Sequence, residues 1–299
     1  MEPSPLAITN ITKKYGDYRG VDNISIELSR GEVFGFLGPN GAGKSTTIRT
    51  VLDFLRPTAG DIRIFGLDSQ KDSVAIKKMV GYLAGDIALY DTMTGRTVLE
   101  YLTSLGKDTD WDYVKTLTKK LDASLDQPLN SLSKGNRQKI GLIQAFMHKP
   151  KLIILDEPTS GLDPLMKQVF YDMVLEMRDA GNTVFVSSHD LTEVQKICDR
   201  AAFIRDGKLI SIEDIRHAKS LNLRRFRATF ESAPDTSKFA ALKTVSDVKS
   251  DGNDVIVTVT GSVGEFVREL AKHNPIDLDE QETDLEDLFM HYYKEGKDA

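Results

Sequence analysis

A glycine-rich segment, GPNGAGKS at positions 38–45, has the residue types and the spacing of a phosphate-binding loop. It fits the pattern GxxxxGK[ST] without a mismatch, and it lies between a predicted strand and a predicted helix. Glycines allow successive backbone N–H groups to turn inward around a polyphosphate, and the start of a helix adds the positive end of its dipole. Lys44 is placed to reach the β- and γ-phosphates, and the hydroxyl of Ser45 is placed to ligate Mg²⁺. The pattern predicts nucleotide binding by Gly38, Pro39, Asn40, Gly41, Ala42, Gly43, Lys44, Ser45 and Thr46.

Two adjacent acids, Asp156 and Glu157, follow the apolar run LIIL at 152–155. A buried strand that ends beside the phosphate loop would bring Asp156 to the Mg²⁺, and Glu157 would lie where it can act on the attacking water. The alternative is a pair of solvent-facing acids at the end of a strand. The apolar run and the phosphate loop together favour hydrolysis of the nucleotide.

Further motifs occur in a fixed order around these two. The segment LSKGN at 132–136 begins a predicted helix upstream of the acids, SGLD at 160–163 follows them, and His189 lies in SSHD after another apolar strand. Tyr15 lies near the amino terminus. With these motifs, residues from about 6 to 215 resemble the nucleotide-binding domain of ABC transporters. A P-loop kinase would leave LSKGN, SGLD and His189 unexplained.

The resemblance implies that two copies of the chain face each other head to tail. Each ATP would lie between the phosphate loop of one copy and the LSKGN signature segment of the other. Ser133 and Gly135, at the start of a helix, would offer a hydroxyl and N–H donors to the γ-phosphate across the interface. Asp163 would lie in the D-loop beside them. The expected assembly is therefore a homodimer that closes on ATP and opens after hydrolysis.

The resemblance also implies the roles of the remaining site residues. The catalytic set would be Glu157, His189 and Lys44, with His189 contacting the γ-phosphate and helping to hold the water. Tyr15 would stack on the adenine. The expected activity is an ATPase that produces ADP and phosphate, and the expected cofactors are ATP and Mg²⁺.

The sequence departs from the family pattern at two places. Lys134 replaces the first glycine of the signature, and Asn136 replaces its terminal glutamine. Most relatives also carry a glutamine after V-G-Y-L-x, where it joins Mg²⁺ to the helical subdomain, but this chain has Gly85 there. Because Asp86 is the next oxygen-bearing side chain, we expect Asp86 to supply the missing contact to Mg²⁺ or to its water.

The elements that position these motifs alternate between strands and helices. Apolar runs at 33–37, 151–155 and 183–187 predict buried strands, and alternation with helix-like segments predicts a mostly parallel sheet covered on both faces. With the resemblance, the fold class is α/β, a P-loop NTPase (RecA-like) ABC cassette. Segments 8–16 and 20–32 predict an antiparallel β subdomain.

The first predicted domain spans residues 1–218 and contains a helical subdomain at about 86–149, where strand signals are weak. The second spans residues 219–299. Its order of elements, β-α-β-β-α-β, predicts a small α+β accessory domain of the ferredoxin-like type. These elements are expected at 225–230, 235–243, 245–250, 254–261, 263–274 and 276–278, with a terminal helix at 284–293.

Charged residues in the second domain have two possible interpretations. Arg224, Arg225 and Arg227 could meet anionic lipid or a partner, but an alternating strand with solvated arginines is favoured. The acidic run 277–287 is interpreted as a solvated face.

Composition narrows the classes of function. The formal net charge of −6 argues against nucleic acid as a partner. No apolar stretch approaches the length of a membrane span, and no secretory signal is visible. Cys198, the one cysteine of the chain, fits a reducing compartment. We therefore expect a peripheral protein at the cytoplasmic face of the cell membrane, working with a separately encoded integral-membrane permease.

The sequences of these motifs are similar to those of bacterial ATPases that export drugs, antibiotics and sodium, so export is favoured over import. The alternative is a regulatory ABC ATPase, membrane-tethered or soluble, that does not drive transport. Translation-type relatives carry two cassettes, and repair-type relatives carry a long coiled-coil insertion. Neither feature fits this chain, but a tethered regulatory ATPase stays open.

Overall fold

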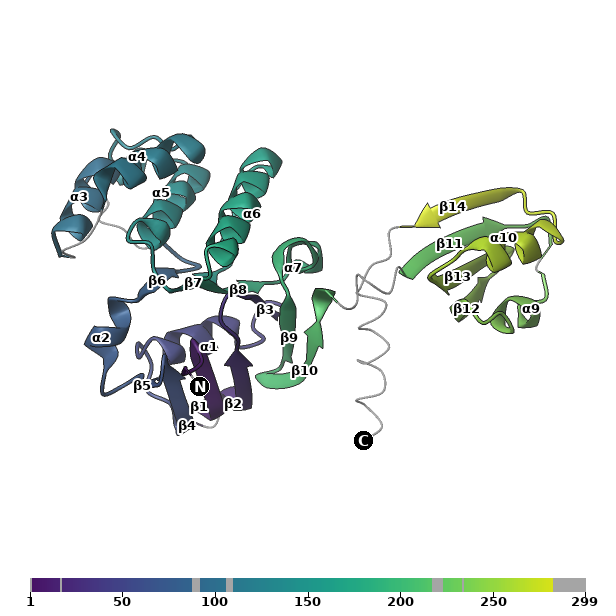
Figure 1. Ribbon diagram of the computed structural model, residues 1–299, viewed down its shortest axis with the longest axis horizontal. Helices are drawn as coiled ribbons and strands as arrows, with labels where there is room; N and C mark the ends of the chain where they lie inside the picture. The colour runs from purple at the N-terminus through teal and green to yellow at the C-terminus, as the bar shows by residue number, and fades with distance from the viewer. Residues whose placement is uncertain are drawn as a thin grey trace. The chain divides into compact units, whose positions relative to one another are not determined.

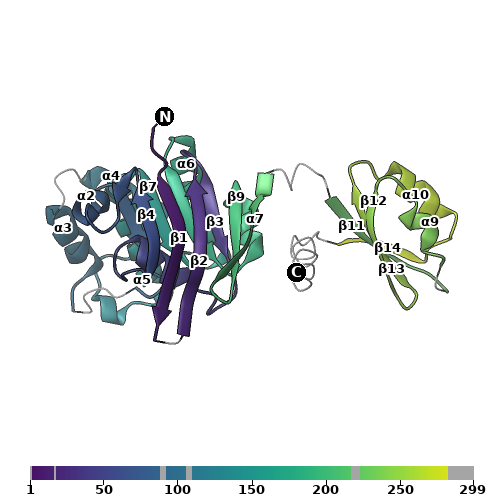
Figure 2. The same ribbon diagram turned by 90° about the horizontal axis from the view of Figure 1, so that it is seen from below.

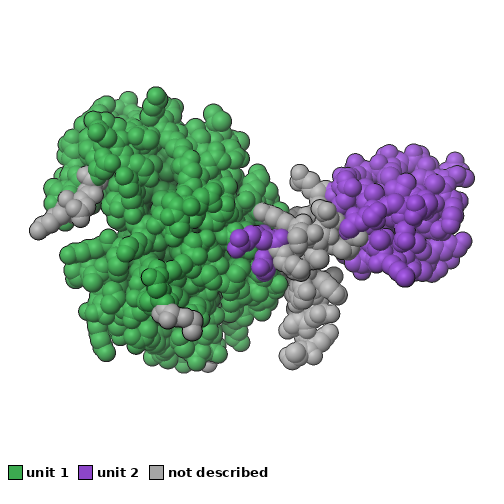
Figure 3. All heavy atoms as spheres, in the orientation of Figure 1, with its two compact units in different colours: residues 1–213 green, residues 214–299 purple. Residues whose placement is uncertain are grey.

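A computed structural model describes residues 2–16, 18–87, 92–105, 110–216, 223–232 and 234–281. The chain divides into two compact units, residues 1–213 and 214–299, which are coloured green and purple in Figure 3. The predicted domain boundary at 218 and the predicted terminal helix at 284–293 lie outside the described residues. Each unit has its own hydrophobic core.

The first unit is built on a six-stranded sheet with the order β10-β9-β3-β8-β7-β6. The five strands β9, β3, β8, β7 and β6 are parallel to one another. Every residue of β3, β7 and β8 is buried, as expected for strands covered on both faces. The strands are β3 (Val33–Leu37), β6 (Val80–Leu83), β7 (Leu152–Asp156), β8 (Thr183–Ser188), β9 (Arg200–Arg205) and β10 (Lys208–Asp214).

A second, antiparallel sheet lies across the first, as Figure 2 shows. Its strands are β1 (Leu6–Tyr15), β2 (Tyr18–Leu28), β4 (Ala59–Ile64) and β5 (Leu67–Asp68). Helix α1 (Lys44–Val51) contacts β1 and β2 of this sheet and β7 of the other. Buried side chains of both sheets and of α1 form one hydrophobic core. The predicted α/β cassette with an antiparallel subdomain is confirmed.

The described part of the predicted helical stretch contains three α-helices and one 3₁₀ turn. They are α3 (Gly95–Leu105), α4 (Trp111–Lys120), the turn η1 (Leu129–Ser131) and α5 (Lys134–Phe146). Figure 1 shows α3, α4 and α5 grouped together at one end of the unit. Helices α2 (Ser73–Lys77), α6 (Pro164–Asp179) and α7 (Leu191–Ile197) complete the described helices of this unit.

Helix α5 packs closely on β6. A Cβ added at Gly81 would lie 2.1 Å from the carbonyl oxygen of Ala145, and one added at Gly141 would lie 2.7 Å from methyl groups of Leu83 and Ile87. Since real Cβ atoms are not found at such distances, the two elements meet without room for a methyl group.

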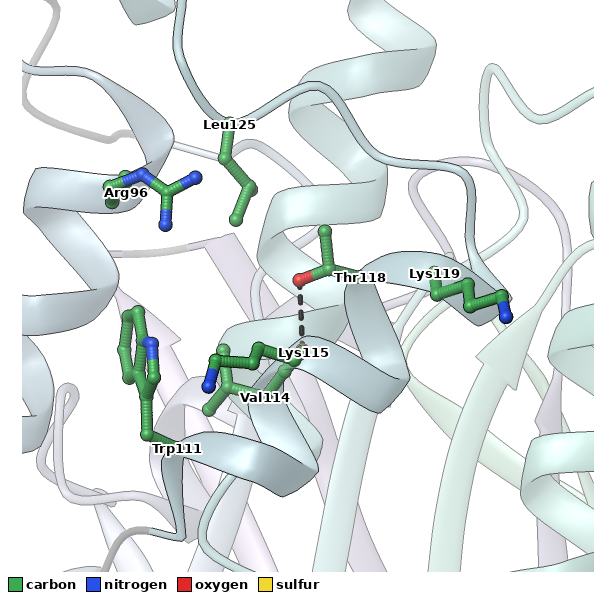
Figure 4. Close-up of a pocket in the computed structure, with 7 residues that line it drawn as sticks. All are labelled: Arg96, Trp111, Val114, Lys115, Thr118, Lys119 and Leu125. Carbon is green, nitrogen blue, oxygen red and sulfur yellow. Dashed lines mark hydrogen bonds between the residues drawn. The ribbon is translucent and has the colours of Figure 1, made fainter.

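A pocket of 230 Å³ lies in the helical group, as Figure 4 shows. The indole of Trp111 and the guanidinium of Arg96 border it, with Val114 and Leu125 supplying apolar walls. Its lining includes no residue of the phosphate loop. The pocket is therefore distinct from the nucleotide site predicted from the sequence.

The second unit contains one four-stranded sheet with the order β12-β13-β11-β14. Phe226, Phe239 and Phe266 are buried in its core. The elements are β11 (Leu223–Thr229), α9 (Ser237–Ala240), β12 (Val245–Asp251), β13 (Asp254–Thr260), α10 (Gly264–Ala271) and β14 (Asp277–Gln281). Arg224 pairs with Glu280 at 2.8 Å and Arg227 with Asp254 at 2.8 Å, so these arginines have partners within their own unit.

Strand β14 covers the start of the acidic run, and its side chains are exposed or half-buried. No helix in the described part of the chain combines the length and the hydrophobicity that a membrane span requires.

Candidate functional site

Three predicted motifs meet at the carboxyl ends of neighbouring parallel strands. The phosphate loop follows β3, Asp156 ends β7, and His189 follows β8. The register pairs Leu37 with Ser188 and Asp156 with Ser187, so the ends of the three strands are level. Ligand sites of open α/β sheets lie at this edge.

The phosphate loop needs glycine for steric reasons at two positions. A Cβ at Gly38 would lie 2.3 Å from the carbonyl oxygen of Ile204, and one at Gly43 would lie 2.7 Å from the carbonyl oxygen of Gly20. Gly43 also has a φ of +105°, in the region that L side chains rarely adopt. At these two positions the backbone of the loop therefore packs directly against neighbouring carbonyl oxygens, which fixes the path of the loop.

Lys44 is buried at the start of α1, with 6% of its surface exposed. Its ammonium donates to the carbonyl oxygens of Gly38 at 2.6 Å and Pro39 at 3.2 Å. The same nitrogen lies 3.1 Å from Oε1 of Glu157. The lysine therefore connects the phosphate loop with the proposed base.

Asp156 is 2% exposed, and one of its oxygens is held by Ser187, whose hydroxyl donates to Oδ1 at 2.6 Å. The other oxygen faces Gly85, where a Cβ would lie 3.2 Å from Oδ2. Burial and the nearby charge of Asp156 raise the pKa of Tyr82, which keeps that phenol neutral. A side chain at position 85 would therefore lie against the carboxylate that is predicted to hold Mg²⁺.

Glu157 lies between a lysine and a histidine. Its Oε2 is 2.7 Å from Nδ1 of His189, and its backbone N–H donates to the hydroxyl of Ser187 at 3.1 Å. The residue has a φ of +50°, which is unusual for a side chain with a Cβ. His189 is 59% exposed at its side chain, so its imidazole can still meet a ligand.

The remaining predicted residues of this site lie around the start of α1. A Cβ at Gly20 would lie 2.8 Å from the ring of Tyr15 and 3.2 Å from the methyl group of Thr46, which places the ring next to α1. The ring is 45% exposed, as stacking on a base requires. Ser45 is half-buried in the first turn of α1, and Asp86 is exposed beyond the end of β6.

The signature segment contacts the D-loop of its own chain. Lys134 donates to the hydroxyl of Ser160 at 2.9 Å, and a Cβ at Gly135 would lie 2.7 Å from the carbonyl oxygen of Gly161. Ser133 caps α5 by accepting from the N–H of Asn136, and Asp163 caps α6 by accepting from the N–H of Met166. Among the described residues, these contacts of the signature segment lie within its own helix and the D-loop, away from the phosphate loop.

Two buried residues of the site were not predicted from the sequence. The first is Ser187, which holds both Asp156 and Glu157. The second is Gln138, 2% exposed, whose amide donates to the carbonyl oxygen of Pro158 at 2.7 Å. A polar residue at the end of an otherwise apolar strand was the available signal for Ser187. Gln138 gave no signal beyond a polar residue on the buried face of a helix.

Comparisons of the chain with known proteins identify its family. A family model described as ABC transporter matches residues 21–160. The chain is 32% identical over 299 residues to the uncharacterized ABC transporter ATP-binding protein YhcH of Bacillus subtilis (strain 168), covering 98% of this chain and 97% of that protein. The chain belongs to the ABC transporter ATP-binding proteins. It is an ABC ATPase, the subunit that binds and hydrolyses ATP for a transporter.

Two further comparisons cover the ABC cassette. The bacitracin transport ATP-binding protein BcrA of Bacillus licheniformis is 34% identical over 221 residues, which are 72% of this chain and 71% of that protein. The dimeric structure of a post-hydrolysis state of the ATP-binding cassette MJ0796, bound to ADP and Pi, has a TM-score of 0.65 at 22% identity and covers 71% of this chain and 99% of that chain. The latter likeness confirms the fold of the ABC cassette.

Proposed function

We propose that this ABC ATPase powers export through a separately encoded membrane permease, and that two copies close head to tail on ATP. One observation carries the dimer: Ser133 caps its own helix and Gly135 packs against the D-loop, whereas Glu157 contacts both Lys44 and His189. A signature segment separated from the phosphate loop of its own chain is available to the nucleotide of a second copy.

The roles proposed for the site residues are those that the family resemblance implies, and the contacts of Glu157 with Lys44 and His189 support them. Lys44 and the loop from Gly38 to Thr46 bind the phosphates, and Tyr15 stacks on the adenine. Glu157 accepts the proton of the attacking water, and His189 holds that carboxylate and the γ-phosphate. From the second copy, Ser133 and Gly135 donate to the γ-phosphate while Asp163 lies beside them.

The residues present fit Mg²⁺. A serine hydroxyl and a carboxylate are hard oxygen ligands, and they leave most of the octahedral positions to water and phosphate, as Mg²⁺ prefers. Ser45 and Asp156 would hold the ion, which would neutralise charge on the phosphates. No group of three or more histidine, cysteine, aspartate or glutamate residues in the described ranges forms a metal site of another kind.

We expect Asp86→Ala to slow hydrolysis and to raise the Mg²⁺ concentration at half-maximal rate by about tenfold, the usual cost of losing an outer oxygen partner. The reason is that Gly85 offers no side chain to Asp156 and Asp86 is the adjacent acid. The measurement is phosphate release at increasing Mg²⁺. Asp172→Ala, an exposed aspartate of α6, is the control. An Mg²⁺ dependence that stays at the wild-type value excludes Asp86 from this role.

The proposed domain layout is a cassette at 1–218, with a helical subdomain at about 86–149, and an accessory domain at 219–299. The element order of the second unit and its strand order β12-β13-β11-β14 support a ferredoxin-like accessory domain.

Export is supported by the likeness to a bacitracin transport protein and by the similarity of the motifs to efflux ATPases. The expected location is the cytoplasmic face of the membrane, bound to the permease. The test is affinity purification of the tagged chain from detergent-solubilised membranes. We expect a multi-span membrane protein to co-purify with the chain in stoichiometric amount. Purification of the chain alone would instead favour a regulatory ATPase.

A further inference from the structure

A buried carboxylate outside the predicted site joins three elements at the catalytic edge. Glu193 lies on α7 and is 6% exposed. The hydroxyl of Thr159 donates to its Oε1 at 2.6 Å, and the hydroxyl of Ser188 donates to its Oε2 at 2.9 Å. The ammonium of Lys167, on α6, lies 2.9 Å from Oε1. This set of side chains is called the Glu193 network below.

Two members of the Glu193 network, Thr159 and Ser188, are close in sequence to the proposed catalytic residues. Thr159 belongs to the turn that begins at Glu157, in which the N–H of Ser160 donates to the carbonyl oxygen of Glu157. Ser188 directly precedes His189, and its hydroxyl also accepts from the N–H of Asp190. The two oxygens of one carboxylate therefore hold the segments that carry Glu157 and His189.

The charge of Glu193 is matched inside the protein. Its hydrogen bond raises the pKa of Lys167, which keeps the partner protonated. A buried carboxylate with a cation and two hydroxyl donors costs less to bury than an unpaired one, and removing a partner from such a group is strongly unfavourable. The network is thus a rigid link rather than a solvated pair.

We propose that Glu193 is a positioning residue for hydrolysis, which sets the separation of Glu157 and His189 by holding Thr159 and Ser188 at once. The 2.7 Å contact between Glu157 and His189 is the geometry that this link maintains. The side-chain hydrogen bonds of Glu193 go to Thr159, Lys167 and Ser188, which lie outside the phosphate loop. Its effect is on the rate of the chemical step, not on nucleotide binding. The inference depends on the proposed roles of Glu157 and His189.

A matched control exists at the opposite end of the strands. Glu32 precedes β3, is 3% exposed, accepts from the N–H of Ser29 at 2.6 Å and pairs with Arg200 at 3.3 Å. Glu32→Gln therefore makes the same chemical change in a buried, paired carboxylate remote from the catalytic edge. The turnover of Glu32→Gln therefore shows how much activity is lost through reduced stability of the fold alone.

The test compares Glu193→Gln, Glu32→Gln, His189→Ala and the double variant of Glu193 and His189 in the full chain. For Glu193→Gln we expect kcat to fall about tenfold to a hundredfold, as displaced catalytic groups do, with KM and nucleotide affinity unchanged. Glu32→Gln lowers the unfolding temperature but keeps kcat. In the His189→Ala background the loss caused by Glu193→Gln becomes severalfold smaller, because the positioned pair is gone.

Three results would overturn the inference: a kcat for Glu193→Gln equal to that of Glu32→Gln, a change confined to KM, or the same fold-loss with and without His189. If Glu193→Gln does not fold, Ser188→Ala replaces it in the same comparison, since it cuts the link to His189 and leaves the carboxylate paired with Lys167. A His189→Ala chain with wild-type turnover would instead refute the proposed role of His189, which separates failure of the site from failure of this inference.

Discussion

Glu157→Gln is expected to lower ATP turnover by about a hundredfold to ten-thousandfold, the range that a positioned general base contributes. The amide keeps the length and the shape of the side chain but cannot take up the proton of the attacking water. ATP binding should persist, because the phosphate loop and Lys44 keep their contacts. The ATP-bound dimer should therefore accumulate, and it is measured by size-exclusion chromatography with Mg²⁺-ATP alongside a phosphate-release assay.

Glu176→Gln is the control for this experiment. Glu176 also accepts from a lysine, Lys120 at 2.6 Å, but it lies on the exposed face of α6. We expect it to leave turnover unchanged. Two results would contradict the proposed mechanism: hydrolysis near the wild-type rate in Glu157→Gln, or a variant that is inactive, binds ATP and stays monomeric.

Lys44→Ala is expected to weaken nucleotide binding by about 3 kcal/mol, or about a hundredfold in Kd, because a charge-assisted contact of a buried cation is lost. The substitution also removes the cation that pairs with Glu157. The rate of hydrolysis at saturating ATP, kcat, should therefore fall in addition to the loss in Kd. Titration calorimetry gives the Kd, and phosphate release gives kcat.

Lys151→Ala is the control for Lys44→Ala, because Lys151 is an exposed lysine before β7, at the opposite end of the strand that carries Asp156. Normal binding and turnover in Lys44→Ala would mean that the phosphate loop is wrongly assigned. Loss of binding in both variants would point to a general effect of removing a lysine instead.

The parts of the site that depend on local spacing could be predicted from the sequence. A run such as GPNGAGKS encodes its own turn and the start of its own helix, and LIIL followed by two acids encodes a buried strand and its end. In both cases the residues that act together are near in sequence. The structure adds distances to these motifs without changing their positions.

The contacts that depend on tertiary packing could not be predicted. The sequence names no partner for Lys134, and only the approach of α5 to the D-loop brings its ammonium to Ser160. Glu193 is separated from Thr159 by 34 residues and gives no motif of its own. A buried carboxylate of this kind is recognisable only when its partners are seen.

The second unit shows the same limit for secondary structure. The predicted helix at 235–243 is observed only as Ser237–Ala240, because Phe239 is its one buried residue and a single anchor does not hold a longer helix. The predicted strand at 276–278 extends to Gln281, since pairing with β11 and the ion pair of Arg224 with Glu280 stabilise acidic residues that have low strand propensity.

The close packing of α5 against β6 has a consequence for how two active sites communicate. Since Gly81 packs against Ala145 of α5 and Gly141 packs against Leu83 of β6, we expect a tilt of α5 to move β6, which leads to Gly85 beside Asp156. In the proposed dimer, the start of α5 senses the nucleotide of the partner, while Gly85 borders the nucleotide of its own chain. Cooperativity between the two ATP molecules would then arise from glycine packing inside each protomer.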